Sequence, residues 1–342
     1  MTATTAARAE TTSARPVERS PLRTWGGRGA LAAAILVAAA LPAMASTYSV
    51  ELASTAVVLA VLAMSTQLLV GVTGLPSFGQ GAYYGVGAYT AVLLAGADIT
   101  VGPVQLVAAS LAGAGAAALT APLVLRTRGT AFLMVTFAVQ SLFQTLAAQW
   151  TSLTNGDEGL QAPPVTAWFG TAPLTNAGYL YWYVLAVFLV VAALTALVLR
   201  SRLGLVLRGC ADHEPRMASL GHRVTGELAA GHIVSGGVAG ASGALLVAVT
   251  RFVTPGDLGF EVAAIALLAA AIGAGSMIGA VVGAIAVVVA RDLIGGETDG
   301  HAPALLAVLF FAVAYGRPAG RAIVARFRKG SPAEASDVTG ES

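Results

Sequence analysis

Apolar stretches long enough to cross a lipid bilayer recur along most of this chain, and they limit its fold more than any other feature. A membrane-spanning helix needs about 17 to 25 mainly apolar residues, and shorter stretches are completed by flanking positions. Hydrophobic residues make up 56% of the sequence and charged residues only 11%, well below the roughly 25% of soluble domains. We therefore predict an all-α, polytopic integral membrane protein with about ten transmembrane helices, near residues 31–46, 50–70, 81–95, 101–125, 131–150, 180–199, 228–250, 261–274, 277–290 and 302–315.

The positions of the cationic residues predict which helix ends face the cytoplasm, because positive residues near span ends prefer that side. Of the 19 Lys and Arg residues, five precede the first predicted span and two follow the fourth. Five more lie in residues 200–223 and five in residues 317–329. With ten spans all of these fall on one side of the membrane, and only Arg251 and Arg291 fall on the other. This count requires helix breaks at residues 71–80 and 273–276, because without either break a basic cluster would fall on the outer side. The pattern predicts a plasma-membrane protein whose amino and carboxyl termini are both cytoplasmic.

This arrangement predicts one membrane domain between two polar ends. We expect residues 1–28 to be a disordered cytoplasmic segment, residues 29–316 to be the transmembrane domain, and residues 317–342 to be a basic cytoplasmic tail that ends in disorder. An alternative stays open, because a basic leader, an apolar run and the small residues at 43–45 also resemble a cleavable signal peptide. Cleavage within residues 1–45 would leave nine spans and keep the internal arginine clusters cytoplasmic.

Several kinds of chemistry are excluded by what the sequence lacks. A Walker A loop needs a lysine after its second glycine, and the only lysine, Lys329, lies in the tail. Neither a G-x-S-x-G nucleophile elbow nor an H-E-x-x-H zinc motif occurs. The single cysteine and four scattered histidines do not suit a metal site, and a net charge of +2 does not indicate nucleic-acid binding. We predict no enzyme activity, cofactor or metal in this chain, and we expect any transport to be energised from outside it.

Glycines at four-residue spacing mark places where we expect helices to pack closely. Lipid supplies no hydrophobic drive between helices, so small residues let their backbones approach. Two ridges are predicted, one formed by Gly236 and Gly240 and the other by Gly275, Gly279 and Gly283.

A helix break between the second and third predicted spans is a candidate for the wall of a transport path. Pro76, with the polar Ser77 and Gln80, interrupts the apolar pattern of residues 74–90. Non-helical backbone at membrane depth survives only where protein or water covers it. The alternative is a simple cytoplasmic hairpin. A nucleotide-binding loop is not indicated, because Tyr84 stands where the third glycine of G-x-G-x-x-G belongs.

The polar segment at residues 200–225 is a second candidate site. It carries five arginines and lies between two apolar stretches that could each cross the membrane, so it is expected at the cytoplasmic surface. It is either a docking surface for a partner or a solvated basic loop whose arginines follow the positive-inside rule.

Several segments together resemble the permease subunits of branched-chain amino-acid ABC importers, in particular the LivM-type branch of the LivH/LivM family. Residues 74–90 are similar to the pattern LSxGHGAFxGxGAYT, and residues 128–138 with 150–160 are similar to RGxYFAMVTLA and WxxLTGGxxGL. Residues 201–221 resemble SRxGRxxRAIRExExRAxxLG, and residues 253–255 with 273–284 resemble VSP and GGLGSLWGPVVGA. These matches occur in the same order as in the family and cover most of residues 50–295.

The resemblance implies a type II importer fold, in which two permease subunits pair and two P-loop ATPase subunits dock below them. ATP would then bind to the partner subunits and not to this chain. A second, LivH-like permease subunit would complete the path, and an extracytoplasmic binding protein would deliver the substrate. This chain is expected to translocate branched-chain or related small amino acids.

The resemblance also implies roles for individual residues. A short cytoplasmic helix is expected to couple the chain to the ATPase subunits, and the matching positions are Arg208, Asp212, Glu214, Arg216, Leu220 and Gly221. Gly221 is expected to end that helix in a left-handed cap. Candidates for the translocation path are Gln67, Ser77, Phe78, Gln80, Tyr84 and Gln140. Their small, uncharged polar groups would suit a zwitterion with an aliphatic side chain.

Some positions depart from the family pattern. Ala211 and Ala218 replace an arginine and a glutamate, and Ile278 and Ala280 replace a tryptophan and a proline. Gln80 stands where a histidine is usual, and related permeases move urea or short amides. A urea or short-amide ABC permease is therefore one alternative, and a stand-alone channel or ion-coupled carrier is another.

Overall fold

The computed structural model describes residues 37–42, 46–168, 171–273 and 275–295. Residues 37–42 form a short helical stretch that belongs to a separate compact unit. All other described residues belong to a second unit. The predictions for both ends of the chain, including the last span and most of the first, lie outside the described residues.

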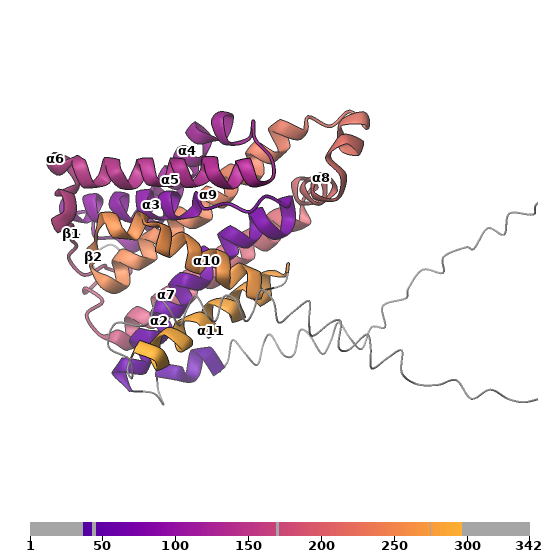
Figure 1. The fold of residues 1–342 in the computed structure, drawn as a ribbon. Helices are drawn as coiled ribbons and strands as arrows, with labels where there is room; N and C mark the ends of the chain where they lie inside the picture. Colours follow the sequence, from indigo (N-terminus) through magenta and orange to yellow (C-terminus); the bar gives the residue numbers. More distant parts are fainter. Residues whose placement is uncertain (1–36, 43–45, 169–170, 274, 296–342) are drawn as a thin grey trace, which may run out of the picture. The chain divides into compact units, whose positions relative to one another are not determined.

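The second unit is built almost entirely from helices, which confirms the predicted all-α class (Figure 1). The long helices are α2 (Thr47–Gln67), α3 (Gln80–Gly96), α4 (Gly102–Val124), α5 (Thr130–Gln149), α7 (Ala177–Arg200), α8 (Arg202–Ser219), α9 (Val224–Thr250), α10 (Phe260–Ile272) and α11 (Met277–Gly295). The short elements are the π-helix η1 (Leu68–Thr73), α6 (Thr151–Thr154), η2 (Gly156–Glu158), η3 (Pro255–Leu258) and the strands β1 (Leu160–Gln161) and β2 (Phe252–Val253). The two strands pair antiparallel, with Leu160 opposite Val253.

Five helices in the described part of the chain are long and apolar enough to cross a membrane: α2 with η1, α4, α5, α7 and α9. The helices α3, α10 and α11, of 17, 13 and 19 residues, occupy three more of the predicted spans. The chain is therefore a multi-pass membrane protein, while the total of ten spans stays a prediction. Both predicted breaks are present, since residues 74–79 separate η1 from α3 and a turn separates α10 from α11.

The two ends of the helices differ in charge. The helix α8 lies at one end, and the strands β1 and β2 lie at the other (Figure 1). Among the described residues, Arg251 and Arg291 are the cations of the strand end, and Arg291 pairs there with Glu261 on α10 at 3.1 Å. The described arginines of the α8 end are Arg126, Arg128, Arg200, Arg202, Arg208, Arg216 and Arg223.

Helix α9 lies at the centre of the packing, against α4, α3 and α2. Glycines at these crossings leave no room for a side chain. A Cβ atom on Gly113 would lie 2.5 Å from the carbonyl oxygen of Gly236, and one on Gly87 would lie 2.3 Å from that of Gly240. The backbones of α3, α4 and α9 therefore touch, which is how small residues bring membrane helices together. Gly236 and Gly240, one of the two predicted ridges, lie at this crossing.

The other predicted ridge is present only in part. A Cβ atom on Gly279 or Gly283 would lie 2.2 Å from the carbonyl oxygen of Gly273 or Ala269, so both glycines pack against α10. Gly275 does not belong to the ridge, because it precedes the start of α11 and has φ of +83° with open space around it. A glycine is favoured at this position of the turn between α10 and α11, because few other residues adopt a positive φ.

A buried polar network joins α3, α4 and α9. The hydroxyl of Tyr83 lies 2.6 Å from Thr120 Oγ1 and 2.8 Å from His232 Nε2. Tyr83 and His232 are completely buried, so neither can exchange its partner for water. The network adds directional contacts to glycine packing that is otherwise apolar.

We expect Tyr83→Phe to lower the melting temperature of the detergent-purified protein. Without the hydroxyl, His232 loses its Nε2 partner in a site that water does not reach, at a cost of about 1–2 kcal/mol. Tyr179→Phe is the matched control, because Tyr179 is 69% exposed and should tolerate the same change. Equal melting temperatures for the two variants would show that the network does not stabilise the fold.

Candidate functional site

The polar segment at residues 200–225 is largely the helix α8, which joins α7 to α9 (Figure 1). The helix is amphipathic. Its residues Leu207 and Cys210 are buried in a cluster with Val72, Leu228 and other apolar side chains of η1, α4, α5 and α9. Most of the opposite face is exposed. One face of α8 therefore seats on the helix bundle, and the other is free for a partner.

The helix α8 consists of two helical pieces. His213 has φ of −159° and ψ of 86°, which are not helical values, and Pro215 follows two residues later. A proline is tolerated in the first turn of a helix, where its missing N–H would have no partner. Residues 202–212 thus form the inner piece and residues 214–219 the outer piece, with the kink between them.

The end of the outer piece has the geometry of a Schellman cap. Gly221 has φ of +88°. The N–H of Gly221 donates to the carbonyl of Ala218 at 3.0 Å, and the N–H of His222 donates to that of Met217 at 3.2 Å. This is the left-handed helix end expected at Gly221, and it satisfies carbonyls that the helix leaves unpaired.

An ion pair links α8 to the turn between α4 and α5. Arg128 Nη2 lies 2.8 Å from Glu214 Oε1, and Arg128 Nε lies 3.0 Å from Glu214 Oε2. The hydrogen bonds from Arg128 hold the pKa of the Glu214 carboxyl below its usual range, although partial burial acts in the other direction. The same hydrogen bonds raise the pKa of Arg128. The pair is therefore ionised at neutral pH, and its contribution is lost only as the pH falls through the lowered pKa of Glu214.

The six residues predicted for the coupling surface have different surroundings. Asp212 and Arg216 are exposed and make no ion pair with any described residue, and Leu220 is 68% exposed. Glu214 is partly exposed and pairs with Arg128 within the chain. Arg208 donates to the carbonyls of Gly204 and Leu199 near the end of α7, so its guanidinium is also engaged within the chain.

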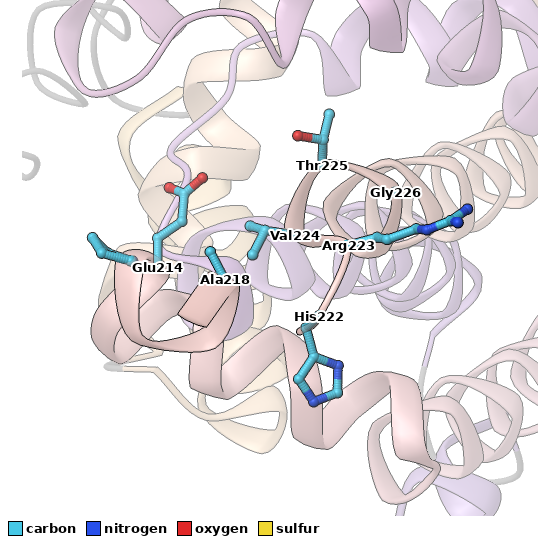
Figure 2. A pocket seen from close by; sticks show the side chains of 8 residues that line it. Glu214, Ala218, His222, Arg223, Val224, Thr225 and Gly226 are labelled. Atoms are coloured by element: carbon cyan, nitrogen blue, oxygen red, sulfur yellow. The ribbon is translucent and has the colours of Figure 1, made fainter. Parts of the chain in front are cut away.

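A groove of about 710 Å³ lies beside the outer piece of α8 (Figure 2). The start of α9 forms its other wall. Its lining residues are Glu214, Pro215, Ala218, His222, Arg223, Val224, Thr225 and Gly226. This groove was not predicted from the sequence, although Pro215 and Gly221, which mark the two ends of the outer piece of α8, are signals of a change in chain direction.

Three of the predicted path residues lie in the packed interior of the helices. Ser65 Oγ on α2 lies 2.6 Å from Gln80 Oε1 on α3, and Ser235 Oγ on α9 donates to the carbonyl of Ser65 at 2.9 Å. Gln67 and Tyr84 are also buried, and neither polar atom of the Gln67 amide has a hydrogen-bond partner. Gln80 thus bonds α3 to α2, and Ser235 continues the network to α9.

The other predicted path residues lie where the segment 74–79 meets α5 and α10. The backbone N–H of Phe78 donates to Thr136 Oγ1 at 3.2 Å, and Ser77 beside it is buried. Gln140 Nε2 donates to the carbonyl of Leu258 at 2.7 Å, while its Oε1 has no partner. These contacts join α5 to the segment 74–79 and to the approach to α10.

Three aromatic rings meet at the same place. The ring centroid of Phe78 lies 5.1 Å from that of Phe260 and 6.4 Å from that of Phe137, and the latter two lie 5.5 Å apart. Phe137 and Phe260 are 43% and 49% exposed, so the cluster presents an apolar surface. Of the three, only Phe78 was predicted for the translocation path, because Phe137 is an ordinary apolar residue within a predicted span and Phe260 directly precedes one. The rings themselves carry no charge, and Glu261, which follows Phe260 on α10, pairs with Arg291.

Comparison with known proteins gives two results. Residues 48–316 match the model of the family described as branched-chain amino acid transport system, permease component. The chain is also 28% identical, over 286 residues, to the high-affinity branched-chain amino acid transport system permease protein LivM of Salmonella typhimurium and to that of Escherichia coli. Each alignment covers 77% of this chain and 67% of the relative. No solved structure matches.

Proposed function

Because the chain belongs to the branched-chain amino acid permease family, we propose that it is the LivM-like permease subunit of an ABC importer. It would carry branched-chain or closely related small amino acids across the plasma membrane, with separate ATPase subunits as the source of energy. The observation that carries this proposal is the family match, since residues 48–316 span the described helices from α2 to α11, including α8.

The position of α8 supports its use as the contact with the ATPase subunits. It lies at the helix end that holds seven of the described arginines, and the positive-inside rule assigns that end to the cytoplasm. Its inner piece is anchored by buried side chains, while Asp212, Arg216 and Leu220 are exposed. A helix whose inner piece is anchored, and whose free face carries charges and one large apolar residue, suits a docking element.

The apolar surface formed by Phe78, Phe137 and Phe260 supports a substrate with an aliphatic part. A zwitterion with an aliphatic side chain can pack against aromatic rings while its polar ends bond to amides and hydroxyls. In this proposal, a second permease subunit forms the other half of the path, and an external binding protein delivers the substrate at the strand end.

Reconstitution tests the proposal. This chain would be co-expressed with its sister permease and two P-loop ATPases taken from adjacent reading frames, then purified through a tag on this chain. We expect the ATPases to co-purify, and we expect ATP-dependent uptake of radiolabelled leucine into proteoliposomes when the binding protein is added. Leucine uptake without ATPase subunits would indicate a carrier or channel, and uptake of urea or acetamide in place of leucine would indicate the short-amide alternative.

A further inference from the structure

The outer piece of α8 has few anchors of its own. Met217 is half-buried, packs against the apolar cluster under α8 and reaches back toward Gly209 of the inner piece across the kink at His213. The other side chains of this piece are exposed, apart from the half-buried Glu214. Among side-chain hydrogen bonds and ion pairs of the described residues, the pair with Arg128 is the one that joins the outer piece to the turn between α4 and α5.

Arg128 is held at the point where α4 turns into α5. Its Nη1 donates to the carbonyls of Leu125 and Thr127 at 2.6 and 2.9 Å, where α4 ends. Gly129 follows with φ of +62°, and α5 begins at the next residue. The Arg128 guanidinium is thus bonded to the end of α4, and the Arg128 backbone leads through Gly129 into the first turn of α5.

Helix α5 connects this turn to the candidate path. It makes the two hydrogen bonds described above, from Phe78 to Thr136 and from Gln140 to Leu258. Phe132, in the first turn of α5, is completely buried in the cluster that also holds Leu207 and Cys210 of α8. A continuous series of contacts therefore runs from the outer piece of α8, through Arg128, to the segment 74–79 and the approach to α10.

The pair is poorly placed to serve stability alone. The two side chains are 34% and 39% exposed, and ion pairs that water reaches contribute little to folding. Its geometry is nevertheless specific, because Nε and Nη2 of one guanidinium bind the two oxygens of one carboxylate. Such a pair fixes the distance and the orientation between two elements that would otherwise move independently.

We propose that the Arg128–Glu214 pair is the link through which movement of the outer piece of α8 reaches α5 and the transport path. Glu214 then acts within this chain, and the ATPase contact falls to its exposed neighbours. This inference rests on the proposed function, because it assumes that an ATPase moves α8. Arg128 and Glu214 are positioning residues in this scheme and do not touch the substrate.

The test uses the complete importer in proteoliposomes, with Arg128→Glu, Glu214→Arg and the double variant that exchanges the two charges. Each single variant should retain the ATPase subunits and hydrolyse ATP, while uptake per ATP hydrolysed falls about tenfold. The exchanged pair should recover to within about threefold of the wild type, because opposite charges again face each other. Arg126→Glu is the control, since Arg126 is exposed in the same turn and should tolerate reversal.

Two results would overturn the inference. One is loss of the ATPase subunits from the Glu214→Arg complex without recovery in the exchanged pair, which would place Glu214 in the intersubunit contact. The other is normal uptake per ATP in both single variants. If charge reversal reduces the yield of folded protein, Arg128→Gln and Glu214→Gln break the pair without introducing repulsion. Both should still lower the uptake per ATP hydrolysed. Failure of the proposed function is distinguishable, because the wild-type chain would then recover no ATPase at all.

Discussion

Gly113→Leu is expected to prevent the helices from assembling. The position lies where α4 crosses α9, and even a Cβ atom there would lie 2.5 Å from the carbonyl oxygen of Gly236 and 2.9 Å from Gly240 Cα. Both neighbours are backbone, so no side-chain rotation can make room. Overpacking a core costs roughly 1–3 kcal/mol when the neighbours can adjust, and we expect the upper end of this range or more here. The measurement is the fraction of monodisperse protein on size-exclusion chromatography in detergent, together with its melting temperature.

Gly115→Leu is the matched control, because it makes the same change two residues along the same helix. No heavy atom lies within 4 Å of a Cβ atom at Gly115, so the side chain would enter open space. We expect this variant to keep the yield and melting temperature of the wild type. Comparable losses in both variants would mean that helix propensity or membrane insertion matters at these positions, and that close contact between α4 and α9 does not.

The helices could be predicted because each is encoded locally. A long apolar run and its polar boundary predict a membrane helix without knowledge of its neighbours. Pro76 lies in the predicted helix break at residues 71–80, and glycines lie in the one at residues 273–276; both breaks are present. The same local logic failed for Gly275, because spacing alone cannot distinguish the last residue of a turn from the first residues of the helix that follows it.

The connections between helices could not be predicted in the same way. Arg128 and Glu214 are 86 residues apart, and only the folded chain brings them within 2.8 Å of each other. Charge and segment position made Glu214 a candidate for a partner contact, but they could not show that an arginine from another turn already binds it. Phe137 and Phe260 illustrate the same limit, since an apolar residue in a membrane span gives no sign of the surface that it joins.

The structure narrows the predicted coupling surface to residues whose charges are free. Asp212 and Arg216 are four residues apart and lie on either side of the kink, and both are exposed without an ion pair among the described residues. Glu214 and Arg208 already bind groups within the chain, so Asp212 and Arg216 are the charged residues of the predicted set that would face an ATPase subunit in the proposed importer.

Exchanging these two charges, by Asp212→Arg with Arg216→Glu, is therefore expected to abolish uptake by separating the permease from its ATPase subunits. Misplacing charges in a desolvated contact costs about 2–5 kcal/mol, which corresponds to a loss of at least about thirtyfold in affinity. The variant should still reach the membrane, because neither side chain contributes to the packed core. Co-purification of the ATPase subunits measures the effect directly, and Glu158→Arg at the strand end is the control that should retain them. If the exchanged variant retains the ATPase subunits fully, α8 does not have the docking role. If the exchanged variant loses them while Glu214→Arg retains them, docking is separate from the transmission assigned to the Arg128–Glu214 pair.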